Sequence, residues 1–453
     1  MELLDVCYEV LIRILEEVNP EDLAACARTS LGFRHFIKEN QLLFKTHYLK
    51  HFDDPRQRSS DPEPSWKAEL QRVVKCQKIL QSNSMEVKRE YFKFVAKTIE
   101  SLVETASETR GESLNRSQLI TFFDNPGNLD AILFRSSLFQ RAGTDSQVPA
   151  DNEADQQLSA KLHCLYGVPL GPIGRRSLST HPYARSRVYD LRNYTDNTRW
   201  GPFREDGSMK VHWEMLEAIM IVLGYNSGTC CQRFIHRFKP VWCDQFGGIV
   251  KSRLATQYPP TLPIEPDIPL ELKDPYNISG IWLRIVCFLV DYNDLYAFNF
   301  GSTNVPADQP RGPITTEEVI RHIIMRFKVT KIEPAGQFDN QALPVAHFTG
   351  SSRSVDAPWD PNANSRIRGI VRLNPEGEVR WTTVSIFYGG EERWRSEGIQ
   401  VGGPNSKRGV IGTWFDKDYD LHGPAGPTAF WKASDRQLHV DVDAEETDEE
   451  SDP

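Results

Sequence analysis

The sequence lacks a long apolar run, and this absence excludes one class of protein. No stretch of about 18 consecutive apolar residues occurs, so we expect no membrane-spanning helix. The longest apolar stretches, such as 281–290, are as short as a β-strand or are interrupted by charge. Glu2, Asp5 and Glu9 make the N-terminus acidic, without the basic start and apolar block of a secretory signal. We therefore expect neither a membrane protein nor a secreted one.

Paired cysteines are also missing. The eight cysteines are scattered, and none stands in a Cys-x-x-Cys pair. Cys230, Cys231, His236 and Cys243 do not have the spacing of the common zinc sites, so we expect core cysteines, an ordinary helical histidine and no bound metal. Unpaired cysteines without a secretion signal fit a reducing compartment, which predicts a cytoplasmic or nuclear location, or both.

The common catalytic motifs are absent as well. The chain has no nucleophile elbow, no Walker loop and no dinucleotide-binding glycine pattern. The sequence singles out no pair of carboxylates for acid–base chemistry. We therefore expect no catalytic residue and no cofactor. An enzyme built on the C-terminal domain stays open as an alternative, which a cluster of buried, pKa-shifted groups in one cleft would favour.

Negative charge is concentrated at the C-terminus. The formal net charge is −9, and residues 441–452 contribute eight acids and no Lys or Arg. The rest of the chain is nearly neutral, which argues against nucleic-acid binding, because such binding depends on positive charge. We expect residues 437–453 to form an acidic, disordered tail.

The first 52 residues have the pattern of packed short helices. Apolar residues from Val10 to Val18 recur at the spacing of one helical face. Pro20 suits the first position of a second helix, where its missing N–H would be unpaired anyway. The next residues, 53–65, are polar and contain three prolines. The sequence therefore predicts an N-terminal module of three to four helices at 1–52 and a linker at 53–65.

The sequence predicts a helical connector at 66–270 and a β-barrel domain at 271–436. Connector helices are expected at 86–104, 158–166 and 211–223. From about residue 271 the apolar pattern alternates, as in strands. Strands are predicted at 281–288, 294–300, 326–333, 344–349, 366–374, 378–388, 395–401, 410–415 and 428–432, with a helix at 315–325. Short turns make consecutive hairpins, and a meander of this length hides its edges by closing into an antiparallel up-and-down β-barrel. The predicted fold class is multidomain α+β.

Specific residues of the N-terminal module resemble an F-box. The family pattern has an apolar-Pro-x-Glu-apolar-Leu start, an Ile-Leu pair, an Asp-Leu that opens the next helix, and a terminal Leu-aromatic. The matching positions are Val6 to Leu11, Ile14, Leu15, Asp22, Leu23, Leu43 and Phe44. Cys7 replaces the usual proline and Phe33 replaces the usual tryptophan. Both replacements keep an apolar contact.

This resemblance implies two partners, a Skp-type adaptor and, through it, a cullin scaffold. A module of about 45 residues cannot bury its whole apolar surface alone, so part of that surface needs a partner. The adaptor-binding residues that the resemblance implies are Leu4, Val10, Leu11, Ile14, Leu15, Leu23, Phe33, Leu43 and Phe44. Lysine at both Leu11 and Ile14 is expected to abolish adaptor capture while the barrel stays folded.

The remainder of the chain resembles F-box proteins of filamentous fungi, in segments such as 189–196, 360–369 and 422–427. Residues 272–432 are also distantly similar to the lipocalin-like β-barrel of an animal F-box-only family that degrades cell-cycle regulators. Two Gly-x-Trp segments, at 280–282 and 412–414, contribute to that similarity. In the animal family the barrel holds the substrate, so the resemblance implies a substrate-recognition domain.

An arginine-rich segment, residues 175–204, is open to three interpretations. Its seven arginines alternate with aromatic residues. They could pair with acids elsewhere in a loop-rich segment that wraps the barrel, bind an acidic or phosphorylated peptide, or bind nucleic acid. We favour the structural interpretation. The candidate substrate-binding residues, taken from this segment and from the predicted mouth loops 351–365 and 417–427, are Arg185, Arg187, Arg192, Arg199, Trp359, Tyr419 and His422.

Together these patterns predict a non-catalytic subunit of an SCF-type cullin ubiquitin ligase. It would bind a Skp-type adaptor through the F-box and an unidentified protein substrate through the β-barrel. The alternative is a small-molecule-binding barrel, a sensor, with the F-box as a regulatory handle. A deep, aromatic-lined cavity would favour the alternative, whereas a barrel packed with side chains would not.

Overall fold

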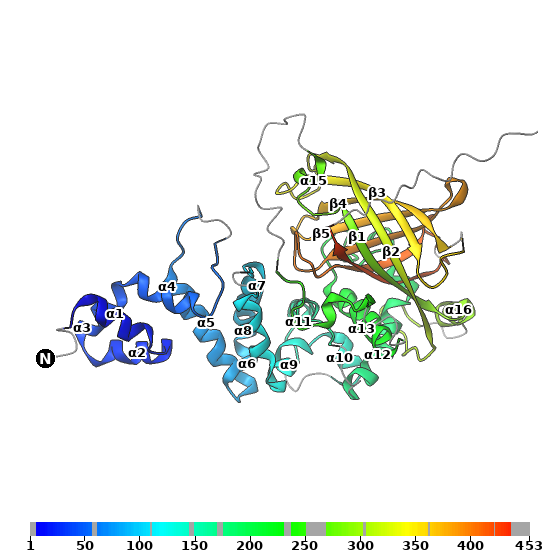
Figure 1. The fold of residues 1–453 in the computed structure, drawn as a ribbon. Helices are drawn as coiled ribbons and strands as arrows, with labels where there is room; N and C mark the ends of the chain where they lie inside the picture. Colours follow the sequence, from blue (N-terminus) through cyan, green and yellow to red (C-terminus); the bar gives the residue numbers. More distant parts are fainter. Residues whose placement is uncertain are drawn as a thin grey trace, which may run out of the picture.

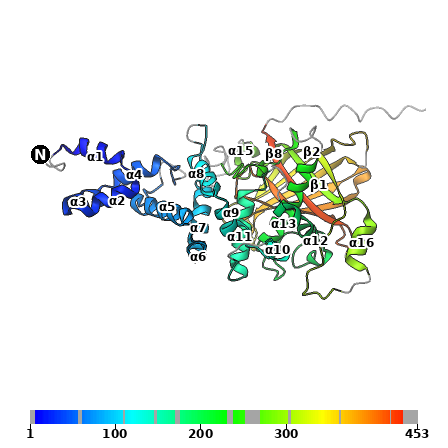
Figure 2. The same ribbon diagram turned by 90° about the horizontal axis from the view of Figure 1, so that it is seen from below.

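The computed structural model describes residues 6–56, 61–108, 111–144, 149–169, 175–230, 237–250, 269–301, 305–360, 363–420 and 422–435. Four short helices, a helical connector and a closed barrel follow one another along the chain (Figure 1). Figures 1 and 2 show the first four helices and the barrel at opposite ends of an elongated molecule. Across the described residues, no helix is long and apolar enough to cross a membrane. The expected acidic tail, 437–453, lies outside the described residues.

The N-terminal module consists of α1 (Tyr8–Glu16), α2 (Pro20–Thr29), α3 (Leu31–Glu39) and α4 (Gln41–Leu49). Pro20 is the first residue of α2, as predicted. Ser30 and Asn40 end the preceding segments and cap α3 and α4, because their side-chain oxygens accept the Phe33 and Leu43 backbone N–H groups. The module shares one buried apolar core.

The connector begins with α5 (Trp66–Gln81), α6 (Met85–Glu90), α7 (Phe92–Glu104), α8 (Leu114–Phe123) and α9 (Pro126–Leu133). It continues with α10 (Ser137–Arg141), α11 (Glu153–Tyr166), α12 (Arg175–Val188), the 3-10 turns η2 (Leu191–Asn193) and η3 (Val241–Cys243), α13 (Trp213–Thr229) and α15 (Leu270–Lys273). Helix α13 is buried over most of its length and packs on the barrel wall. It therefore joins the connector and the barrel into one core.

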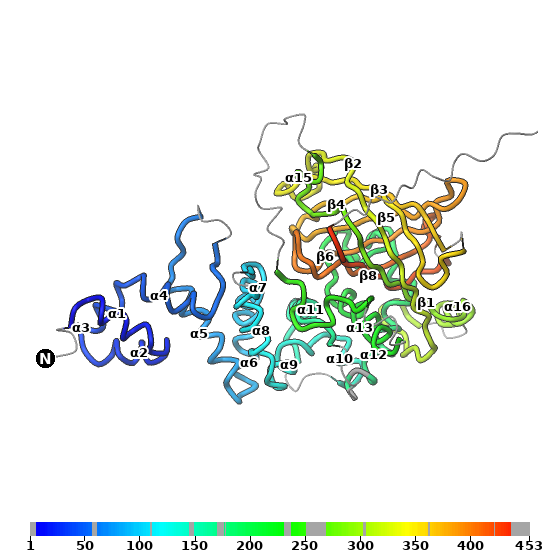
Figure 3. The backbone as a smooth tube through the Cα atoms, in the orientation of Figure 1, coloured from blue at the N-terminus to red at the C-terminus, as the bar shows by residue number. Residues whose placement is uncertain are grey.

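The barrel strands are β1 (Gly280–Leu289), β2 (Glu318–Glu333), β3 (Val345–Ser354), β4 (Ser365–Leu373), β5 (Val379–Ile386), β6 (Glu392–Gln400), β7 (Val410–Asp416) and β8 (Ala425–Ser434). The short turn η6 (Tyr388–Gly390) links β5 to β6. Each strand pairs antiparallel with the next, and β8 pairs back on β1, which closes the barrel (Figure 3). The predicted up-and-down β-barrel and the α+β class are confirmed.

Two elements of the barrel were predicted wrongly. The strand expected at 294–300 is a helix, α16 (Tyr292–Phe300), which Asp291 caps by accepting the Asn293 N–H at 2.8 Å. The helix expected at 315–325 is the first half of β2. Ile320 and Ile324 pack on the connector side of β2, whereas Ile323 and Met325 face the barrel core. A strand that is apolar on both faces has no period of two, so its spacing imitates a helix.

Two connector predictions also need correction. Much of the segment expected to be loop-rich, 175–204, is helix α12, which continues through Pro182. Helix α13 does not end at Gly224 but runs on to Thr229. A Cβ at Gly224 would lie 3.0 Å from the Val168 side chain, so this glycine permits a close approach instead of ending the helix.

Candidate functional site

The N-terminal module exposes apolar side chains. Val10 and Ile14 lie one turn apart on α1, and they are 46% and 41% exposed. Tyr8 is also exposed, although its ring packs on Phe36 and its hydroxyl accepts a hydrogen bond from the Asn40 side chain. Five large apolar residues are exposed in the described part of the module, and we call them the N-terminal apolar set: Tyr8, Val10, Ile14, Leu31 and Leu42.

The predicted adaptor-binding residues fall into three groups. Val10 and Ile14 are exposed, and Phe33 is half-buried. Leu4 lies outside the described residues. The buried ones, which form the module's own core, are Leu11, Leu15, Leu23, Leu43 and Phe44. The spacing of apolar residues in the sequence identified the module, but it did not identify Tyr8, Leu31 and Leu42 as exposed residues.

A groove runs between the N-terminal module and α5. It has a volume of about 430 Å³ and an apolar floor that includes Leu23, Phe44 and Leu70. Lysines from both sides, including Lys38 and Lys75, line its edges. No residue of the N-terminal apolar set lines this groove, so the groove is a second, separate apolar surface of the module.

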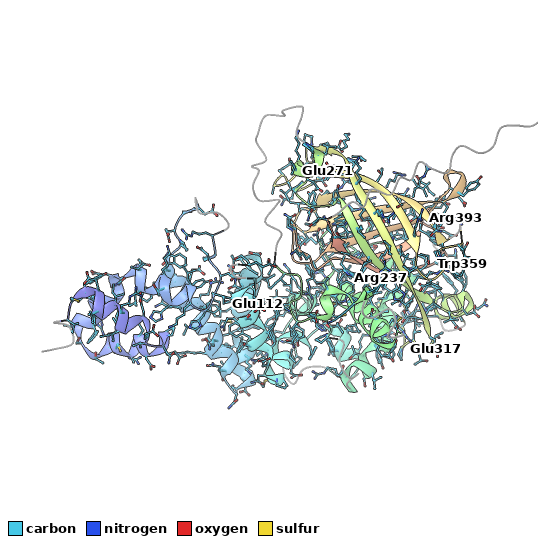
Figure 4. All side chains as sticks on the ribbon, viewed as in Figure 1. Glu112, Arg237, Glu271, Glu317, Trp359 and Arg393 are labelled. Atoms are coloured by element: carbon cyan, nitrogen blue, oxygen red, sulfur yellow. The ribbon has the colours of Figure 1, made fainter. Side chains whose placement is uncertain are left out.

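One end of the barrel has an aromatic rim. The β1–β2, β3–β4, β5–β6 and β7–β8 connections all lie at this end, because consecutive strands are antiparallel; we call it the mouth. Figure 4 labels Trp359 and Arg393 there and Glu271 at the opposite, closed end. The exposed aromatic residues of these four connections are Tyr292, Tyr296, Phe300, Trp359, Tyr388 and Tyr419.

Contacts at the mouth join α16 to the last loop. The Tyr296 hydroxyl donates to the His422 carbonyl oxygen at 3.0 Å, and the rings of Phe300 and His422 lie 4.9 Å apart. Tyr419 accepts a hydrogen bond from Arg395 at 3.0 Å. The structure thus places the predicted Trp359, Tyr419 and His422 at one end of the barrel. The aromatic residues of α16 also lie at this end. They were not predicted as mouth residues because 294–300 was assigned to a barrel strand.

The barrel interior is divided into two halves. Towards the closed end, the rings of Trp282, Phe327, Phe348, Trp381 and Phe430 pack with centroids 4.6–6.4 Å apart. Towards the mouth, the strand alternation turns polar side chains inward. The buried members of this polar half include Arg284, Ser352, Thr383, Ser396 and Thr428. Side chains therefore fill the closed half.

Arg185 belongs to a buried network between the connector and the barrel. Its Nε donates to the Glu318 carboxylate, whose side chain is fully buried. The Tyr189 hydroxyl and the Asn226 amide donate to the same carboxylate at 2.6 Å and 3.0 Å. Burial alone would raise the pKa of Glu318, but hydrogen bonds and the Arg185 charge outweigh burial and lower it.

The other predicted arginines lie outside the Glu318 network. Arg187 bonds the Ser137 hydroxyl at 2.9 Å and lies 3.7 Å from Glu214. Arg192 holds the Asp190 carboxylate through two nitrogens and also donates to backbone carbonyls. Both line a polar cavity of about 490 Å³. Arg199 is exposed. Internal partners thus engage Arg185, Arg187 and Arg192, which is the arrangement that the structural interpretation predicted.

Family comparison assigns the N-terminal module. Residues 3–45 match the F-box domain, so the predicted F-box is confirmed. The match covers the first helices and none of the barrel. No curated protein and no solved structure matches the chain. The similarities to fungal F-box proteins and to a lipocalin-like barrel stay predictions. In the described part of the chain, no three potential metal ligands come together.

Proposed function

We propose that this chain is the substrate-recognition subunit of an SCF-type cullin ubiquitin ligase. F-box domains bind Skp-type adaptors within such complexes, and residues 3–45 match this domain. The observation that carries the proposal is that the matched helices keep Val10 and Ile14 in solvent, far from the barrel in Figures 1 and 2. Exposed apolar side chains gathered on so small a module are typical of a surface that a partner covers.

The elongated shape supports a role in positioning. The F-box lies at one end and the barrel at the other, with the connector between them (Figure 1). Helix α13 packs on strands of the barrel and on α11 and α12, so the barrel is held firmly by the connector. A substrate bound to the barrel would be kept at a set distance from the ubiquitin-charged enzyme. The chain would act by raising the local concentration of a target lysine, without bond chemistry of its own.

We place the substrate at the mouth of the barrel. Six exposed aromatic residues from four connections surround it. Aromatic side chains lose little conformational entropy on binding and bury a large area, which makes them frequent anchors in protein interfaces. Predicted substrate residues Trp359, Tyr419 and His422 lie at this mouth, whereas Arg185, Arg187 and Arg192 are already bonded to other residues of the chain.

Purification of the full chain from a proteasome-inhibited host, followed by mass spectrometry, tests the proposal. A Skp-type adaptor and a cullin should co-purify with it. Proteins that co-purify and become more abundant when the proteasome is inhibited are the candidate substrates. Recovery of the chain with neither adaptor nor cullin would contradict the proposed function.

Serine at both Trp359 and Tyr388 is expected to reduce substrate capture about tenfold or more. These two aromatics are 79% and 95% exposed at the mouth, so their loss removes contact area without disturbing the core. The measurement is quantitative recovery of the candidate substrate in the same purification, with the adaptor signal as an internal standard, because adaptor recovery should not change.

Phe338 provides the matched control. It is 84% exposed in the β2–β3 connection, at the closed end. Phe338→Ser removes a similar exposed ring, and substrate capture should stay at the wild-type level. Equal losses in the mouth variant and in Phe338→Ser would argue against the mouth as the binding surface.

A further inference from the structure

Arg284 is a buried cation inside the barrel. It lies on β1, two residues after the core residue Trp282, so both side chains point to the interior. Its β8 neighbour across the sheet is Phe430, another core residue. Only 6% of Arg284 is exposed. The guanidinium therefore sits in the polar half of the barrel, above the aromatic packing of the closed end.

The bonding of Arg284 is incomplete. Its Nε donates to the Thr428 hydroxyl oxygen at 2.9 Å, and that hydroxyl donates in turn to the Ile285 carbonyl at 2.9 Å. Thr428 thus fixes the plane of the guanidinium. Among the described residues, no carboxylate forms an ion pair with Arg284, and burial is the one cause that lowers its pKa, to about 10. The group stays charged at neutral pH.

Other buried arginines of this chain are bonded to carboxylates or to backbone carbonyl oxygens. Arg185 pairs with Glu318, and Arg380 pairs with Glu397 at 2.8 Å. Arg408, which is fully buried, donates to the Cys164 and Gly247 carbonyl oxygens at 2.8 Å. In the described part of the chain, Arg284 has neither a carboxylate nor a carbonyl partner. Burying a charge without a partner is unfavourable, so an unpaired arginine in the barrel interior marks a place for an anion.

The geometry favours a carboxylate. A guanidinium presents two parallel N–H groups that match the two oxygens of a planar carboxylate. With Nε held by Thr428, the two terminal nitrogens remain to make this contact. A single carboxylate neutralises the single charge of Arg284, whereas a phosphate dianion would exceed it.

The surroundings suit an anion attached to an apolar body. Buried hydroxyls of Ser352, Thr383 and Ser396 lie in the same half of the interior. Nearer the mouth, the rings of Trp394 and Trp414 meet edge to face at 5.2 Å. Polar groups therefore share the part of the interior that contains Arg284, and two indole rings lie between this part and the rim.

We propose that Arg284 anchors a binding site for a carboxylate that enters the barrel through the mouth. The proposal rests on the proposed role of the mouth and extends it by naming the chemistry recognised inside. The carboxylate belongs to a small free acid or to an acidic side chain of a bound polypeptide.

Thermal unfolding of the full chain with matched acids and amides tests this site. One arm uses millimolar acetate, benzoate and 4-phenylbutyrate, each compared with its neutral amide. The other uses a blocked aromatic peptide with a central glutamate, compared with its glutamine counterpart. An acid that binds the folded state raises the unfolding temperature, and the neutral partner should not. A shift with the small acids assigns the site to a free acid, and a shift with the glutamate peptide alone assigns it to a polypeptide.

Arg284→Met separates recognition from a structural role. Because it removes an unpaired buried charge, we expect this variant to unfold at the same or a higher temperature than wild type, and to lose the acid-dependent shift. If Arg284→Met fails to fold, Thr428→Val provides the test. It keeps the charge of Arg284 but no longer fixes the orientation of the guanidinium, and it should weaken acid binding about tenfold. No acid-dependent shift in wild type, an unchanged shift in Arg284→Met, or a less stable Arg284→Met protein that still folds would each overturn the proposal. Adaptor capture by the same samples reports separately on the proposed ligase role.

Discussion

Lysine at both Val10 and Ile14 is expected to lower capture of a Skp-type adaptor at least about 100-fold while the barrel stays folded. Full burial of an apolar side chain contributes about 1.5–3 kcal/mol, so Val10 and Ile14, which are already about half-buried, would each contribute about half of that, and lysine also brings a charge that the interface must desolvate. Together, the lost contacts and the added charges remove about 3 kcal/mol or more of binding free energy, which corresponds to about 100-fold or more. Adaptor affinity can be measured by titration of the purified full chain.

A matched control uses two exposed leucines outside the F-box. Leu178 and Leu272 are 53% and 48% exposed, close to the exposure of Val10 and Ile14. Leu178→Lys with Leu272→Lys adds the same charge and removes a similar apolar area, and it should leave adaptor affinity unchanged. If the Val10 and Ile14 variant still binds the adaptor with wild-type affinity, α1 does not contribute to the interface.

Sequence periodicity located this helix but did not orient it. Leu11 and Ile14 both fit one apolar face, and both were predicted to contact the adaptor. In the structure Leu11 is 2% exposed and lies in the module core, whereas Ile14 is exposed. Lysine at Leu11 would therefore unfold the module and could not distinguish lost binding from lost folding. Residues three positions apart on a helix differ by about 60° around its axis, so at the edge of a packed face one can be buried and the other exposed.

The barrel strands were predictable where apolar and polar residues alternate along the strand, and less so elsewhere. In β4, Ile367 and Val371 point inward while Arg366 and Arg368 point outward, and that strand was predicted almost to its ends. The first half of β2 has apolar residues on both faces, and there the prediction failed. Arg284 did leave a signal, since it is the single charge in an apolar strand. Its meaning depends on which residues face it from β8, and one strand's sequence cannot supply that.

Alanine at Glu318 is expected to lower the free energy of unfolding by about 3–5 kcal/mol, because it leaves Arg185 as a buried, unpaired charge. The carboxylate also accepts hydrogen bonds from Tyr189 and Asn226, which would lose their acceptor. Glu318 lies on β2, and its partners lie on or beside α12 and α13, so the loss weakens the junction between barrel and connector. Urea unfolding followed by tryptophan fluorescence measures the effect.

The same site predicts a dependence on pH. The pKa of Glu318 is lowered below its ordinary value of 4.5, because hydrogen bonds and the Arg185 charge outweigh the opposing effect of burial. A carboxyl group with a lowered pKa in the folded state contributes stability above its unfolded pKa and loses that contribution as pH falls through its folded pKa. The stability difference between wild type and Glu318→Ala should therefore be constant at neutral pH and shrink below pH 4.5.

Two further variants separate the ion pair from the loss of side-chain volume. Glu317 is the exposed neighbour of Glu318 (Figure 4), and Glu317→Ala should change the unfolding free energy by less than about 0.5 kcal/mol. Arg185→Met combined with Glu318→Leu removes both charges and retains apolar volume. We expect this double variant to lose at least about 1 kcal/mol less than the sum of its single variants, because neither charge is left buried alone. Additive losses would mean that Arg185 and Glu318 stabilise the junction independently, through packing and their separate hydrogen bonds.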